Sequence, residues 1–372
     1  MSKTRFKTYP LLHPLLWLYG LAVNLRNKLF DKGILKQRKF NIPIICVGNI
    51  TAGGTGKTPH IEYLIRLLSP QYKVAVISRG YKRKSKGFRI VEVDSEVQNV
   101  GDEPLQIKQK YPDTLVVVDK NRVNAIEKIL SIEKAERPDV ILLDDGFQHR
   151  YVQPSLSIVL VNSHRPVFED ELLPVGLLRE PMNRIEDADI VLITKCNSDI
   201  TSTECKFYEK GLEFYSNFLF FTTFDYETIQ PVFPDFGNVG ADLCVCPLND
   251  FQNKHVLLVA GIASPQPLVE KLQQKTDNLY THFFPDHHFF TEKDIEIIQK
   301  QANSINSDNK IILTTEKDAV RFRTMPLSDE MKKIMYYIPI QVKFVEEQDM
   351  FNDTIIQHIK NFSQNRTSKI VN

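Results

Sequence analysis

The most constraining feature of the sequence is a glycine-rich segment between an apolar run and an amphipathic run. Residues 42–47 are apolar and predict a buried strand, and apolar residues recur at helical spacing over residues 60–68. Between them, residues 48–59 contain glycines that let backbone N–H groups turn inward around an anion, and Gly-Lys-Thr opens the helix. This layout predicts a phosphate-binding P-loop.

The loop departs from the usual pattern at one position. The pattern G-x-x-x-x-G-K-[ST] places a glycine five residues before Gly56, where this chain has Thr51. An alternative interpretation is a flexible strand–helix turn that binds nothing. Glycines followed by Lys-Thr favour phosphate binding, with Lys57 on the outer phosphates and the Thr58 hydroxyl on Mg²⁺. The predicted nucleotide-binding residues are Thr51, Ala52, Gly53, Gly54, Thr55, Gly56, Lys57 and Thr58.

From residue 42 onward, short β-branched apolar runs alternate with helical stretches. Such runs predict strands that are buried on both faces, as in a parallel sheet covered by helices. The runs in the first part of the chain are residues 73–78, 114–118, 140–143, 157–161 and 189–193. The predicted fold class is therefore α/β, with a P-loop NTPase-like, mostly parallel sheet that has helices on both faces.

A smaller C-terminal α/β domain is expected after a proline-broken, aromatic stretch that indicates a linker. Its predicted strands are residues 255–260, 279–284 and 310–313, and the run 335–344 is expected to return to the linker as a strand. The predicted domain boundaries are 1–40 (an amphipathic membrane-surface helix), 41–225 (the P-loop domain), 226–240 (the linker), 241–344 (the smaller domain) and 345–372 (a C-terminal helix).

The N-terminal segment combines positive charge with an apolar face. Residues 1–40 contain nine Lys or Arg and one acidic residue, although the net charge of the whole chain is only +1. The apolar part, residues 15–23, is far shorter than the roughly 20 residues that span a bilayer, and no convincing signal-peptide cleavage site follows it. We predict an interfacial helix on an anionic membrane; the alternative is a helix packed on the protein's own core. The residues that share one helical face are Leu11, Leu15, Leu18, Ala22, Leu25 and Leu29, with Trp17 and Tyr19 available for the headgroup boundary.

The cysteines indicate a reducing compartment. They are five in number and show neither CxxC pairing nor His partners at metal spacing, which favours reduced thiols in a cytoplasmic protein. They are Cys46, Cys196, Cys205, Cys244 and Cys246.

Polar residues follow several predicted strands, at the sheet edge where ligands bind in such folds. The run 140–143 ends in Asp144 and Asp145, which is typical of a Walker B strand whose carboxylate holds Mg²⁺. The sequence does not match the GTPase signatures. The Asp-x-x-Gly motif requires Asp three residues before Gly146, and this chain has Leu143 there. Residues 193–196 (Ile-Thr-Lys-Cys) do not match the guanine-binding motif Asn-Lys-x-Asp. A kinase needs a carboxylate that activates or orients the acceptor hydroxyl, and the acidic segment 101–104 (Gly-Asp-Glu-Pro) offers one. The alternative interpretation of this segment is an ordinary acidic helix N-terminus.

Eight motifs occur in one order along nearly the whole chain. They lie at residues 48–59, 78–81 (Ser-Arg-Gly-Tyr), 101–104, 144–149 (Asp-Asp-Gly-Phe-Gln-His), 172–181, 260–265, 284–287 (Phe-Pro-Asp-His) and 314–318 (Thr-Thr-Glu-Lys-Asp). In this combination the sequence resembles the tetraacyldisaccharide 4′-kinase family, the lipid A 4′-kinases. That family carries Thr in its loop where generic P-loops carry Gly, so the resemblance accounts for Thr51.

The resemblance implies a substrate, cofactors and a location. It implies an ATP- and Mg²⁺-dependent kinase that phosphorylates the 4′-hydroxyl of a tetraacyldisaccharide 1-phosphate in lipid A biosynthesis. The enzyme would act peripherally at the cytoplasmic face of the inner membrane, with no nucleic acid and no required protein partner. The alternative function is a P-loop ATPase or metallochaperone-like switch that acts on a protein partner.

The resemblance also implies roles for single residues. Asp102, assisted by His287, matches the catalytic carboxylate, although the neighbouring His288 leaves open which histidine acts. Because Asp102 precedes the linker and His287 follows it, we expect this pair to form only when the two domains close. Lys57, Arg122 and Arg179 match cations near the transferred phosphoryl group. The residues that match the metal site are Thr58, Asp144, Asp145, Gln148 and Glu180.

Overall fold

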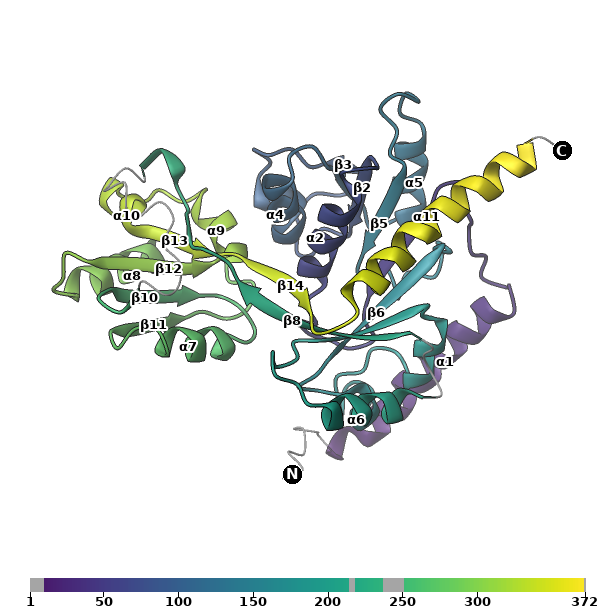
Figure 1. Cartoon of the computed structure of the whole chain (residues 1–372), viewed down its shortest axis with the longest axis horizontal. Helices are drawn as coiled ribbons and strands as arrows, with labels where there is room; N and C mark the ends of the chain where they lie inside the picture. The colour runs from purple at the N-terminus through teal and green to yellow at the C-terminus, as the bar shows by residue number, and fades with distance from the viewer. Residues whose placement is uncertain (1–9, 214–217, 237–250, 371–372) are drawn as a thin grey trace. The chain divides into compact units, whose positions relative to one another are not determined.

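The computed structural model describes residues 10–213, 218–236 and 251–370. It divides the chain into two compact units (Figure 1). The first unit comprises residues 1–93, 107–224 and 342–372, and the second comprises residues 94–106 and 225–341.

The first unit is built on a mostly parallel sheet with the strand order β14-β8-β7-β6-β1-β5-β2-β4-β3. β1 lies at its centre and pairs in parallel with both β5 and β6. The short edge strand β3 is antiparallel to β4. At the other edge, backbone hydrogen bonds from Glu227 to Pro339 and from Val345 to Phe221 make β14 antiparallel to β8. The strands are β1 (Ile44–Gly48), β2 (Val74–Ser78), β3 (Arg89–Ile90), β4 (Leu115–Val118), β5 (Val140–Asp144), β6 (Leu156–Asn162), β7 (Ile190–Thr194), β8 (Leu219–Tyr226) and β14 (Ile340–Phe344).

Helices cover both faces of this sheet, as the continuous apolar runs predicted. Alternate residues of a strand point to opposite faces, and in β1 Ile44 and Cys46 join a core cluster with residues of α5 and α6. Val47 faces the other way, toward His60 and Tyr63 of α2 and Phe351 of α11. The helices of the chain up to β8, together with the C-terminal one, are α1 (His13–Asp31), α2 (Lys57–Leu68), α3 (Val97–Val100), α4 (Asp102–Lys110), α5 (Arg122–Leu130), α6 (Ser202–Leu212) and α11 (Gln348–Ile370).

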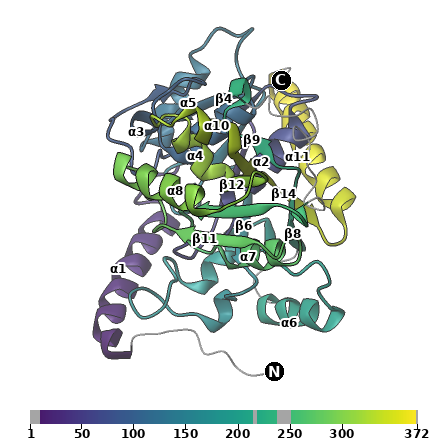
Figure 2. The same cartoon turned by 90° about the vertical axis from the view of Figure 1, so that its left-hand side faces the viewer.

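The N-terminal helix α1 lies at the periphery of the first unit (Figures 1 and 2). Its inward positions recur every three or four residues and include the buried Gly20, Asn27 and Phe30. Among the described residues, no helix has both the length and the apolar character needed to cross a membrane.

The second unit has its own sheet, with the strand order β11-β10-β12-β13-β9. β10, β11, β12 and β13 run in parallel, and β9 is antiparallel to β13. The pairing of β13 with β9 confirms that the run after residue 335 returns to the stretch predicted as a linker, part of which is therefore a strand. The elements are β9 (Gln230–Pro231), β10 (His255–Ala260), β11 (Leu279–Phe283), β12 (Lys310–Thr315), β13 (Met335–Ile338), α7 (Gln266–Gln273), α8 (Glu292–Ser304), α9 (Glu316–Phe322) and α10 (Asp329–Ile334).

Three of the five cysteines fall within the described residues. Cys46, Cys196 and Cys205 are free thiols, and burial raises the pKa of Cys46 and of Cys196 to about 12. Cys244 and Cys246 lie outside the described residues.

Candidate active site

The glycine-rich loop joins the end of β1 to the start of α2. Gly53 and Gly56 have φ angles of +117° and +86°, which glycine adopts without the steric cost that other residues incur. At Gly48 a Cβ atom would lie 2.5 Å from the Cβ of Phe147, so any side chain there would collide with Phe147, which lies two residues after Asp145. The loop geometry therefore depends on these three glycines.

Thr51 fits the loop because its environment is polar and buried. The Asn49 side-chain amide donates to the hydroxyl oxygens of Thr55 at 3.0 Å and of Thr51 at 3.4 Å. The Thr51 carbonyl accepts a 2.9 Å hydrogen bond from Arg179 Nε. Thr51 is not among the residues with a positive φ, so glycine is not required at this position.

Two cations meet one carboxylate beside the loop. Lys57 Nζ lies 3.4 Å and an Arg179 guanidinium nitrogen 3.3 Å from the same oxygen of Asp145. Burial alone would raise the pKa of Asp145, but Lys57 and Arg179 hold it below its usual range. Arg179 also donates to Asn49 Oδ1 at 2.5 Å. Lys57 and Arg179 are thus placed beside the loop, with their charge balanced by Asp145.

The adjacent Asp144 is positioned by residues at the carboxyl ends of the neighbouring strands. Ser78, the last residue of β2, donates to Asp144 Oδ2 at 2.9 Å. Arg122 is 3% exposed, and its guanidinium lies within hydrogen-bond distance of the backbone carbonyls of Asp119, Lys120 and Asp144. Burial lowers the pKa of Arg122. Arg122 therefore braces the carboxyl ends of β4 and β5.

The helix α1 contacts the residues predicted to surround the metal. Glu180 is 4% exposed and accepts a 2.8 Å hydrogen bond from Asn27, with Arg26 at 3.5 Å. Arg26 also donates to the Gln148 carbonyl at 2.6 Å, while the Gln148 side-chain amide donates to the Asn49 carbonyl. Arg26 and Asn27 were not predicted as site residues, because nothing in the sequence pattern of α1 indicates which residues lie beneath it.

Tyr19 also belongs to this contact. Its hydroxyl donates to the Arg179 carbonyl at 2.9 Å. This contact with the protein differs from the predicted position of Tyr19 at the lipid headgroup boundary. The inward-facing residues Tyr19, Arg26 and Asn27 thus bind α1 to the segment that contains Arg179 and to its surroundings.

The side chains around the loop offer the donors that Mg²⁺ prefers. Hydroxyl and carboxylate oxygens are its usual protein ligands, and Thr58, Asp144 and Asp145 supply these at the loop and at the end of β5. Asp145 and Glu180 already face cations. Asp144 accepts from the Ser78 hydroxyl and interacts electrostatically with the buried Arg122. The donor set fits the ion.

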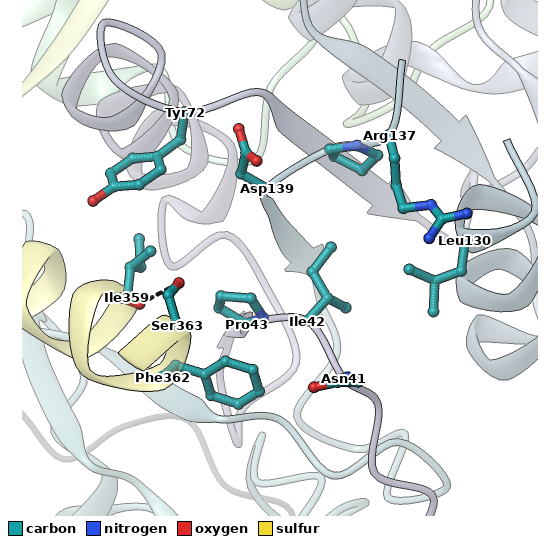
Figure 3. A pocket seen from close by; sticks show the side chains of 11 residues that line it. Asn41, Ile42, Pro43, Tyr72, Leu130, Arg137, Asp139, Ile359, Phe362 and Ser363 are labelled. Atoms are coloured by element: carbon teal, nitrogen blue, oxygen red, sulfur yellow. Dashed lines mark hydrogen bonds between the residues drawn. The ribbon is translucent and has the colours of Figure 1, made fainter. Parts of the chain in front are cut away.

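A cavity at the other edge of the same sheet contains none of these residues. It has a volume of about 170 Å³ and lies where the chain enters β1, β2 and β5, beside α11 (Figure 3). Because the loop follows the carboxyl end of β1, this cavity is remote from the predicted phosphate site. Its lining residues are Asn41, Ile42, Pro43, Tyr72, Leu130, Arg137, Pro138, Asp139, Ile359, Phe362 and Ser363.

The second unit contains an ion cluster centred on Asp102, the first residue of α4. Asp102 is 5% exposed and lies 3.1 Å from His287 Nδ1. Arg321 of α9 binds both of its oxygens, with its Nε at 3.0 Å from Oδ1. Burial alone would raise the pKa of Asp102, but the hydrogen bonds from His287 and Arg321 hold it well below its usual range.

The contacts of His287 determine which of its nitrogens carries the proton. Lys317 Nζ lies 3.0 Å from His287 Nε2, and an ammonium group can only donate. Nε2 is therefore the acceptor, and Nδ1 donates to Asp102. His288 instead lies 3.0 Å from Asp294 and stacks on Phe284. Of the two histidines, His287 is the one that contacts Asp102.

The expectation that Asp102 and His287 meet only on domain closure is wrong. Residues 94–106 belong to the second unit together with His287, and the hydrogen bond is formed within that unit. Arg321 was not predicted as a partner of Asp102. Lys317 and Arg321 are four residues apart on α9 and so share one helical face, a signal that could have indicated two cations facing one site.

The same cluster superficially resembles a metal site. Ligand atoms of Asp102, Glu103 and His287 lie within 4.8 Å of one another, the one such grouping among the residues that the structure describes. However, Lys317 Nζ is 3.2 Å from Glu103 Oε1, and the Arg321 guanidinium forms an ion pair with Asp102. The two cations already neutralise these carboxylates, so a metal ion does not fit here.

The fold and the glycine-rich loop are those of a P-loop nucleotide-binding protein. A model of the tetraacyldisaccharide-1-P 4′-kinase family, LpxK, matches residues 8–360. The tetraacyldisaccharide 4′-kinase of Phocaeicola vulgatus is 48% identical over 358 residues, covering 95% of this chain and 96% of the relative. That of Bacteroides thetaiotaomicron is 44% identical over 369 residues, covering 98% and 97%.

The structural comparison agrees. A crystal structure of LpxK from Aquifex aeolicus in complex with ATP matches with a TM-score of 0.70 at 29% identity and covers 94% of this chain and 98% of that one. The chain belongs to the tetraacyldisaccharide 4′-kinase family, whose members are phosphotransferases.

Proposed function

We propose that this protein transfers the γ-phosphoryl group of ATP to the 4′-hydroxyl of a tetraacyldisaccharide 1-phosphate, a step of lipid A biosynthesis. The observation that carries this proposal is the family match over residues 8–360, which includes both the phosphate loop and the Asp102 cluster. The similarity to an LpxK structure that contains ATP supports the choice of phosphoryl donor.

On the donor side, the loop N–H groups and the start of α2 bind the phosphates. Lys57 and Arg179 stabilise the transferred group; when ATP binds, its phosphates compete with Asp145 for both cations. Arg122 keeps the ends of β4 and β5 in place. Thr58, Asp144 and Asp145, with Gln148 and Glu180 nearby, would hold Mg²⁺, which when bound neutralises charge on the β- and γ-phosphates.

On the acceptor side, Asp102 accepts the hydrogen bond of the sugar hydroxyl. Phosphoryl transfer passes through a loose transition state in which positioning matters more than strong proton abstraction. A carboxylate with a lowered pKa suits this role, because it stays ionised and orients the hydroxyl. His287 and Arg321 keep that carboxylate in one position by bonding to it from two directions.

The substrate is a lipid, and α1 supports contact with a membrane surface. Its outward apolar residues are exposed, with Trp17 at 75%, Leu18 at 65% and Leu21 at 68%. Exposed leucines and a tryptophan on a basic segment are typical of interfacial helices. We therefore place the enzyme peripherally at the cytoplasmic face of the inner membrane, with the inward face of α1 packed on the protein itself.

The proposal is tested with the full-length protein, ATP carrying a labelled γ-phosphate, and the acceptor lipid in detergent micelles. Label should enter the lipid with the wild-type protein. It should fall by at least two orders of magnitude with Lys57→Met, because the loop lysine is lost, and stay unchanged with Lys210→Met on the exposed face of α6. ATP hydrolysis that ignores the lipid but responds to a protein would instead support the switch-like alternative.

A further inference from the structure

Lys195 lies against the phosphate loop, although the mechanism proposed above does not use it. It directly follows β7, and a Cβ atom on Gly54 would lie 4.0 Å from its Nζ. The position is well fixed: the Lys195 carbonyl accepts a 2.8 Å hydrogen bond from Ser163, and the preceding Thr194 donates to the Thr55 carbonyl in the loop at 2.9 Å. The backbone that carries the side chain is therefore fixed to the loop, and the ammonium group lies beside the exposed Gly54.

The Lys195 ammonium has no protein partner within the described part of the chain. No hydrogen bond or ion pair joins its Nζ to a described residue, although the side chain is half-buried. Burial lowers its pKa, and no carboxylate offsets the effect. Lys57 differs in this respect, since Asp145 balances its charge. Keeping a partly desolvated ammonium without a counter-ion is unfavourable, and a bound anion would remove that cost.

The strand order places the two lysines on different flanks of the loop. β1, which leads into the loop, lies between β5 and β6, with β7 next to β6. Lys57 pairs with Asp145 just beyond β5, whereas Lys195 approaches Gly54 from the end of β7. A nucleotide bound on the loop would therefore meet a cation from the β7 flank as well.

We propose that Lys195 is a second nucleotide-binding lysine, whose ammonium contacts oxygens of the ribose and inner phosphates of the bound nucleoside triphosphate. Lys57 and Arg179 then act on the outer phosphates. The inference rests on the proposed use of ATP but not on the identity of the acceptor. Since Lys195 contributes to binding and not to the transferred phosphoryl, it affects the KM for ATP more than kcat.

The test compares Lys195→Met, which keeps the length of the side chain, with Lys195→Arg and with the exposed control Lys210→Met. Binding of ATP to the full-length protein is measured by titration calorimetry, and the KM for ATP is measured with the acceptor lipid. A hydrogen bond to a charged group corresponds to about a 10- to 100-fold change in affinity. We expect Lys195→Met to raise the Kd and KM for ATP by that factor, Lys195→Arg to recover most of the affinity, and Lys210→Met to change neither.

Two results would overturn the inference. The first is ATP binding by Lys195→Met within twofold of wild type. The second is equal weakening in Lys195→Met and Lys195→Arg with unchanged melting temperatures, because the positive charge would then not matter. Failure of the proposed function is distinguishable, since a wild-type protein that binds ATP but labels no lipid leaves the binding comparison intact.

Discussion

At the scale of single residues, Asp102 and His287 form an ordered pair. Arg321 binds Asp102 through two nitrogens, and His287 Nδ1 donates to the same carboxylate. The carboxylate is thereby kept ionised and fixed in orientation, as the proposed positioning of the acceptor hydroxyl requires. The site is defined by this hydrogen-bond arrangement and not by acidity alone.

The two adjacent histidines provide a matched pair of variants. We expect His287→Ala to lower kcat for lipid phosphorylation by at least tenfold, because Asp102 loses the donor that orients it. His288→Ala should leave kcat within about twofold and mainly lower the melting temperature, because it loses the contacts with Asp294 and Phe284. Equal losses of kcat in the two variants would show that the assignment to His287 is mistaken.

His60 makes stability depend on pH. It is buried in α2 between the Gly56 carbonyl at 2.7 Å and the Thr222 hydroxyl at 3.1 Å, and burial lowers its pKa from 6.5 to about 4. Between those values the unfolded chain binds a proton that the folded chain does not, so stability falls as pH falls from 6.5 toward 4. The full effect is about 3 kcal/mol.

This dependence is checked by following the melting temperature from pH 7 to pH 4. The wild-type protein should lose stability over that interval, and His60→Gln should show a flatter profile, although lower stability at pH 7. His164→Gln, a change at an exposed histidine, should keep the wild-type slope. A wild-type slope in His60→Gln would contradict the argument.

At the scale of elements, one face of α1 contacts the protein and the other is exposed to solvent. Its inward face bonds to Arg179 and Glu180 through Tyr19 and Asn27, and its outward face exposes leucines and Trp17. A helix with this division can lie on a membrane while remaining fixed to the loop region. The proposed membrane contact and the contacts with the segment that contains Arg179 and Glu180 therefore belong to one element.

We expect the double variant Leu18→Glu/Leu21→Glu to lose most of its binding to vesicles that contain anionic lipids, because each change removes exposed apolar surface and adds a repelled charge. Co-sedimentation measures this binding. The control is Ile297→Glu on α8, which is also an exposed apolar position and should bind like wild type. Undiminished binding of the double variant would show that another surface makes the contact.

The elements that were predictable from sequence are those with a strong local pattern. The apolar runs that became β1, β2, β4, β5, β6 and β7 are buried on both faces, as their continuous apolar character predicts. β8 was not predicted, since its residues alternate irregularly between buried and half-buried. The short strand β9 was not predicted, because it lies in a proline-containing stretch and forms a strand only by pairing with β13.

At the scale of the whole molecule, the family resemblance located the expected residues but not all of their contacts. The phosphate loop was predictable because it is local in sequence. The Asp102–Arg321 contact joins residues 219 positions apart, and the assignment of residues 94–106 to the second unit depends on tertiary packing. No local pattern contains that information, which explains why the pair was expected to need domain closure.

The measurement that tests the account most directly is the structure of the product. The wild-type protein is incubated with ATP, Mg²⁺ and tetraacyldisaccharide 1-phosphate, and the lipid product is analysed by mass spectrometry and phosphorus NMR. The account predicts one added phosphate, attached at the 4′-oxygen, and none when Asp102→Asn replaces the wild-type protein. A phosphate at another position, or ATP consumption without a phosphorylated lipid, would contradict it.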